Sequence, residues 1–124
     1  MNANEKIAKI ESTLLGYEDH GIFTAILYLH YGDSGQGAGM YSLDQYDKKT
    51  ERRHGTAAGM DFIIGVLRAC GVDQWEKVKG RTIIAIMDGI GDDWNAKVIG
   101  LKPLPTEGGT EFLFADAFPV AVEA

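Results

Sequence analysis

The sequence predicts an α+β domain in which a mostly antiparallel sheet of five to six strands has one main helix packed across it. Two observations carry this prediction. Several short segments rich in β-branched and aromatic residues are separated by turn residues, whereas only residues 56–70 show the apolar period of a helix. The length of 124 residues fits a single domain that spans residues 1–124.

The first part of the chain is expected to form three strands. Residues 7–17 fit either a short helix or a strand, and the turn residues that follow favour the strand. Residues 22–31 are apolar on both faces, which is typical of a central strand. We interpret the glycine-rich segment 32–39 as a wide, mobile hairpin loop, after which residues 40–43 pair back as a third strand.

The helix at residues 56–70 has a start signal and a stop signal. Thr56 is a suitable N-cap, and Gly71 stands where a left-handed residue closes a helix. The apolar positions at helical spacing are Met60, Ile63, Ile64 and Leu67. Three further strands are expected at residues 81–87, 96–101 and 111–118.

Composition excludes several classes of protein. The net charge of −6 argues against general nucleic-acid binding, which needs a broad basic surface. A single cysteine, Cys70, rules out an intrachain disulfide and a cysteine-rich zinc site. The chain has no apolar run long enough for a membrane span, so we expect no membrane association and a cytoplasmic location.

The densest positive charge lies just before the predicted helix. The candidate anion-binding residues are Lys48, Lys49, Arg52, Arg53, His54 and Thr56. Arginine presents a planar fork to phosphate, and a helix N-terminus adds free N–H groups, so this segment predicts a site for a phosphate-bearing small ligand. The alternative is a solvated loop whose positive charges are offset by Asp44, Asp47 and Glu51.

Other candidate chemistry is weaker. Asp88, Asp92 and Asp93 offer oxygen ligands without the spacing of a calcium loop, and we predict neither a metal nor a cofactor. The glycine-rich segment has no phosphate-loop motif. Asp19 and His20 could supply an acid and a base at one turn, although adjacent strand residues point to opposite faces.

Three ordered motifs carry a resemblance to a known group of proteins. They are LGYEDHGIFTAILYLHYGDSGQGAGMYSLD, RHGTAAGM and GVDQWEKVKGRTI, and together they span Leu15 to Ile83. This pattern resembles a family of small, uncharacterised proteins encoded by bacteriophages and prophages. The resemblance implies a non-enzymatic binding protein in the host cytoplasm that counteracts a defence system. It would block a nuclease complex, as anti-CRISPR inhibitors do, or sequester a signalling nucleotide.

The working surface is expected to combine the basic loop with a second group of residues. This second candidate partner surface consists of Glu18, Asp19, His20 and Gln36. One alternative function is a phage DNA-metabolism accessory that binds single-stranded nucleic acid through the basic loop and tyrosines. Another is a small nucleotide-processing enzyme that uses Asp19 and His20. A homodimer would cover the sheet face that one helix leaves open.

Overall fold

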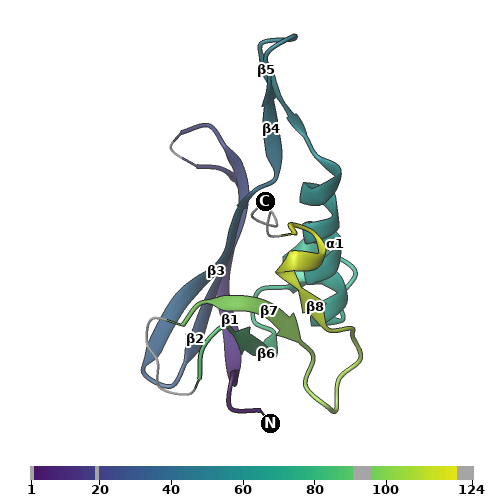
Figure 1. Cartoon of the computed structure of the whole chain (residues 1–124). Helices are drawn as coiled ribbons and strands as arrows, with labels where there is room; N and C mark the ends of the chain where they lie inside the picture. The colour runs from purple at the N-terminus through teal and green to yellow at the C-terminus, as the bar shows by residue number, and fades with distance from the viewer. Residues whose placement is uncertain (1, 19, 91–95, 120–124) are drawn as a thin grey trace.

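The computed structural model describes residues 2–18, 20–90 and 96–119. Its main sheet has six antiparallel strands in the order β3-β2-β1-β6-β7-β8, and one long helix, α1, packs on it, which confirms the predicted α+β class (Figure 1). The sheet strands are β1 (Glu5–Tyr17), β2 (Phe23–Tyr31), β3 (Ser34–Ser42), β6 (Thr82–Met87), β7 (Val98–Lys102) and β8 (Phe112–Leu113). The remaining elements are a separate hairpin of β4 (Asp44–Asp47) and β5 (Arg52–Gly55), the helix α1 (Ala57–Cys70), and the 3-10 turns η1 (Trp75–Lys77) and η2 (Phe114–Asp116).

Helix α1 begins and ends where the sequence predicted. The Thr56 hydroxyl accepts a hydrogen bond from the Gly59 N–H at 2.9 Å, and Gly71 closes the helix with φ 66°. The helix turns Phe62, Val66 and neighbouring small residues into the core. No helix within the described ranges has the length and apolarity needed to cross a membrane.

The sheet is curved, so that its edge strand β3 approaches β7, which lies next to the opposite edge. The Gln36 side chain on β3 donates to the Ala96 carbonyl, which precedes β7, at 3.5 Å. Aromatic rings from β3, α1, β8, η2 and the segment after η2 pack together near this contact. Tyr41 on β3 and Phe118, which follows η2, stack with ring centroids 4.7 Å apart. The core therefore lies between the concave face of the sheet and α1.

Two segments of the main sheet differ from the sequence-based prediction. The wide glycine loop is wrong, because Gly32 and Asp33 alone form the turn and Gly35 to Gly39 lie within β3. Gly32 has φ 60°, so it supplies the left-handed residue that a two-residue turn needs. The long last strand is also wrong, because only Phe112 and Leu113 pair with β7 before the chain turns into η2 and buries Phe114.

The basic segment is a hairpin and not a loop. β4 and β5 pair from Asp44 opposite Gly55 to Asp47 opposite Arg52, as a two-stranded sheet separate from the six-stranded one in the described part of the chain. The hairpin projects from one end of the molecule, beside the start of α1 (Figure 1). Its extension carries the basic residues away from the core.

Candidate functional site

Two hairpin turns extend from the same end of the molecule (Figure 1). One is the β1–β2 turn, which is closed by a hydrogen bond from the Glu18 N–H to the Ile22 carbonyl at 3.0 Å. The other is the β4–β5 hairpin. We call the surface formed by Glu18, His20 and residues 44–55 the two-hairpin end.

Asp44 joins the bases of these two hairpins. Its carboxylate accepts the Phe23 backbone N–H of β2 at 3.2 Å and a two-point contact from the Arg53 guanidinium at 3.0 Å for each oxygen. Ser42 donates a further hydrogen bond at 3.2 Å. The Asp44 side chain is only 6% exposed, so these bonds are largely shielded from water. Hydrogen bonding from Arg53 lowers the pKa of the Asp44 carboxyl group, which stays ionised.

Sequence reasoning missed the structural role of Asp44, which it treated as one of three offsetting charges. The pairing of Arg53 with Asp44 does match that alternative interpretation. Antiparallel pairing places Asp44 and Arg53 on the same face of the hairpin, one diagonal step apart. The β4–β5 register, had it been predicted from the sequence, would have indicated the ion pair between Arg53 and Asp44.

Three cations remain exposed at the hairpin tip. Lys48, Lys49 and Arg52, here called the basic tip, are all exposed. None of their side chains has an ion pair or hydrogen bond within the described part of the chain. The turn is shaped by Glu51, which has φ 57°, and by the Lys49 N–H, which donates to the Asp47 carboxylate at 2.8 Å. These positive charges are available to a negatively charged partner.

The structure separates the basic tip from the start of α1. The four residues of β5 span roughly 13 Å at about 3.3 Å per residue. Thr56 is occupied by the helix cap and also donates to the Leu43 carbonyl at 3.2 Å, while Arg53 is committed to Asp44. The six candidate anion-binding residues therefore do not converge in one pocket.

His54 belongs to the side of the hairpin opposite Arg53. Its Nε2 lies 2.7 Å from the Thr50 hydroxyl and 3.9 Å from the Asp47 carboxylate. With Lys48 and Thr56 it lines a shallow depression of about 400 Å³. The Asp47 carboxylate and the Lys48 ammonium group both line this depression. Because a carboxylate repels phosphate, the depression is not a dedicated phosphate pocket.

The second predicted surface is divided between two ends of the sheet. Glu18 and His20 are exposed at the β1–β2 turn, and Asp19 lies outside the described residues. Gln36 lies near the opposite end of β2, half-buried, where its side chain accepts from the Tyr31 hydroxyl and donates to Ala96. The amide of Gln36 therefore links β3 to the chain before β7.

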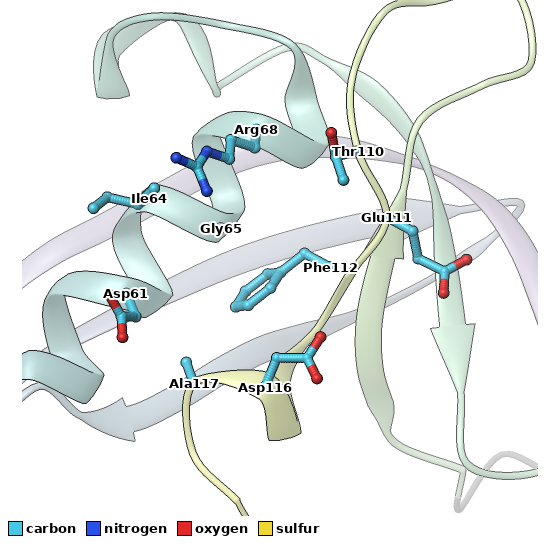
Figure 2. Close-up of a pocket in the computed structure, with 9 residues that line it drawn as sticks. All are labelled: Asp61, Ile64, Gly65, Arg68, Thr110, Glu111, Phe112, Asp116 and Ala117. Atoms are coloured by element: carbon cyan, nitrogen blue, oxygen red, sulfur yellow. The ribbon is translucent and has the colours of Figure 1, made fainter.

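A cleft that the sequence did not indicate runs between α1 and β8 (Figure 2). It has a volume of about 270 Å³, and the Phe112 ring lies beneath Gly65 at its floor. Asp61 stands across the cleft from Glu111 and Asp116. Arg68 and Thr110 are the other polar residues of the lining, which contains no histidine or cysteine among the residues that the structure describes.

Groups suited to catalysis or metal binding are dispersed. Burial raises the pKa of the Cys70 thiol to about 11, which keeps it protonated at neutral pH. Asp88 accepts the Lys97 backbone N–H at 2.7 Å, while Asp92 and Asp93 lie outside the described residues. In residues 2–18, 20–90 and 96–119, no group of three or more His, Cys, Asp or Glu side chains is placed to hold a metal ion.

Comparison of the chain with protein-family models, with curated proteins and with solved structures finds no match.

Proposed function

We propose that this chain is a non-enzymatic binding protein that attaches to a macromolecular partner through its two-hairpin end. The observation that carries the proposal is the basic tip, which is exposed on a projecting hairpin whose base is fixed by Asp44. A contact surface that is ordered before binding loses less conformational entropy in the complex. The three exposed cations of the basic tip suit phosphate or carboxylate groups of a partner.

A macromolecular partner fits this geometry better than a small nucleotide. A small phosphate ligand needs several donors that converge within hydrogen-bond distance of one point. Here the basic tip and the N–H groups at the start of α1 are separated by the length of β5, and Thr56 and Arg53 already have partners. Sequestration of a signalling nucleotide is therefore the less favoured form of the proposal.

The resemblance to phage-encoded proteins supplies the biological setting of the proposal. The resembling segments between Leu15 and Ile83 include the β1–β2 turn, Asp44 and Arg53. We place the protein in the cytoplasm of the infected host, where it binds a defence complex and blocks it. In this proposal the basic tip contacts an acidic region of that complex, because complementary charges steer association and suppress wrong partners.

The experiment is an infection assay with matched charge variants. A phage is plated on strains that carry one defence system each, a CRISPR–Cas nuclease or a nucleotide-signalling system, with and without this protein. We expect the protein to restore plaque formation on at least one strain. Reversal of all three residues of the basic tip to Glu should reduce that restoration by tenfold or more.

A second triple variant controls for the change in net charge. It reverses two lysines and one arginine that are exposed elsewhere on the molecule: Arg68, Lys79 and Lys97. This variant should restore plaque formation as the unmodified protein does. No restoration on any strain by the unmodified protein, or equal loss in both triple variants, would contradict the proposal.

A second candidate function is binding of single-stranded nucleic acid. It is favoured by Tyr46, which is 50% exposed on β4 within two residues of the basic tip and is suited to stack on a base. Three cations predict a slope of about −2 in a plot of log affinity against log salt concentration for a single strand. Fluorescence anisotropy with a labelled oligonucleotide tests this, and the tip variant should abolish the slope.

A further inference from the structure

Strand β1 changes neighbours along its length. Its first residues pair with β6, and its later residues pair with β2. On the β6 side the last backbone hydrogen bonds belong to Ile10, which donates to the Arg81 carbonyl at 2.8 Å and accepts from the Gly80 N–H at 2.7 Å. Beyond Ile10, no strand of the described residues pairs with this side of β1. We call the side of residues 12–17 that faces away from β2 the open edge.

The pairing of β1 with β2 shows which backbone groups point to the open edge. The Phe23 N–H donates to the Asp44 carboxylate at 3.2 Å, and the Phe23 carbonyl accepts the backbone N–H of the residue after β3 at 2.8 Å. Both groups therefore point away from β1, so Phe23 and Tyr17 form a non-hydrogen-bonded pair. Because such pairs alternate along an antiparallel ladder, the N–H and C=O groups of Thr13, Leu15 and Tyr17 face the open edge.

These backbone groups have no hydrogen-bond partner within the described part of the chain. Successive donors are about 7 Å apart, which is the repeat of an extended backbone. Apolar side chains accompany them, since Leu15 is 36% exposed and Tyr17 is 71% exposed. The half-buried Trp75 donates its indole N–H to the Thr13 hydroxyl at 3.2 Å, at the end of the open edge nearest β6. An added strand would therefore gain main-chain hydrogen bonds and apolar contacts together.

The two outer strands of the sheet carry features that discourage further pairing. β8 has only two residues, and β3 is bulged at Met40, which has φ 64°. Short edge strands and bulges are devices by which native proteins prevent the addition of another strand. Residues 12–17 contain no charged residue and no proline, and the bulge of β1 comes before them, between Ile10 and Ser12. The open edge is thus the part of the sheet best suited to receive a strand.

We infer that an extended segment of a partner protein adds to the open edge of β1 as a further strand, in line with β6. Strand addition takes its affinity from main-chain hydrogen bonds and its selectivity from alternate side chains. The segment therefore carries apolar side chains on the face beside Leu15 and Tyr17. A second copy of this chain is the less suitable occupant, because two chains with a net charge of −6 repel each other. The inference goes beyond the proposed function, which depends on the basic tip.

Hydrogen exchange of the full chain, resolved by amide NMR, tests the assignment of the open edge. In the free chain the amides of Thr13, Leu15 and Tyr17 should exchange at least tenfold faster than those of Leu14 and Gly16, which bond to β2. Equal protection of the two groups would overturn the inference, because the edge would already be covered. Protection that increases with protein concentration would also overturn it, since a second copy would then be the occupant.

The probe for binding is a peptide with the sequence of β6, Thr-Ile-Ile-Ala-Ile-Met, with two lysines added at each end for solubility. It copies the strand that pairs with the same side of β1 in this structure. It should bind with a dissociation constant below about 1 mM and slow the exchange of the three open-edge amides. The same peptide with proline in place of the residue that corresponds to Ile84 is the control for charge, and it should bind tenfold or more weakly.

Leu15→Pro removes one N–H of the open edge and leaves the ladder to β2 in place, since proline is tolerated where the N–H of an edge strand faces solvent. This variant should bind the β6 peptide tenfold or more weakly than the unmodified chain. Equal binding by Leu15→Pro, equal binding of the proline peptide, or no binding of the β6 peptide at about 1 mM would overturn the inference. The measurements on the unmodified chain do not depend on the folding of this variant, and none of them needs a defence partner.

Discussion

Replacement of Gly59 by alanine separates local helix propensity from tertiary packing. Gly59 lies in the first turns of α1, directly against the backbone of Leu43. An added Cβ would lie 2.8 Å from both the Leu43 Cα and its carbonyl carbon, and closer still to the carbonyl oxygen. Such contacts require movement of the backbone, since no flexible side chain can yield there.

The two opposing effects have different sizes. Alanine stabilises a helix by about 1 kcal/mol relative to glycine. Against this gain, overpacking of a tight contact costs about 1 to 3 kcal/mol. The Leu43 carbonyl also accepts hydrogen bonds from the Thr56 N–H and hydroxyl, both at 3.2 Å, and their disturbance adds about 1 kcal/mol. We therefore expect Gly59→Ala to lower the free energy of unfolding by about 1 to 3 kcal/mol.

Urea denaturation followed by circular dichroism measures this change. Gly16→Ala is the control, because an added Cβ at Gly16 meets no atom within 4 Å. Its effect on the unfolding free energy should stay within about 0.5 kcal/mol. A Gly59→Ala variant that is more stable than the unmodified chain would show that helix propensity outweighs the contact, and the reasoning would then be refuted.

Three further predictions follow from single contacts. Asp44→Asn should lower the unfolding free energy by about 1 to 3 kcal/mol at neutral pH through loss of the charged bonds to Arg53. Because the pKa of Asp44 is lowered in the folded chain, its contribution is present above the ordinary carboxyl pKa and is lost as pH falls through the lowered value. Urea midpoints of the two chains should therefore converge in acid, and a constant difference would contradict this. Cys70, with a pKa of about 11, should react with a thiol reagent only in denaturant, and rapid labelling of the folded chain would contradict its burial. Trp75→Phe should cost about 1 kcal/mol in urea denaturation, since it loses the indole hydrogen bond to Thr13 at 3.2 Å, and an unchanged midpoint would count against that bond.

The sequence alone determined the features that depend on interactions between residues close together in the chain. The helix α1 was predictable because its apolar spacing, its Thr56 cap and its Gly71 stop all act within a few residues. The strand of residues 81–87 was predictable for a similar reason, since a run of β-branched residues favours extended backbone wherever it packs. The location of the basic cluster could also be found from composition alone.

Only the tertiary structure decided how these pieces meet. The glycines of β3 form a strand because β2 offers a pairing edge, and local preference would have left them as a loop. The basic tip stands apart from the start of α1 because β4 and β5 pair and extend the chain between them. The contact of Asp44 with Phe23 joins residues far apart in sequence. Such long-range contacts depend on the burial and pairing of whole elements, which no short stretch of sequence specifies on its own.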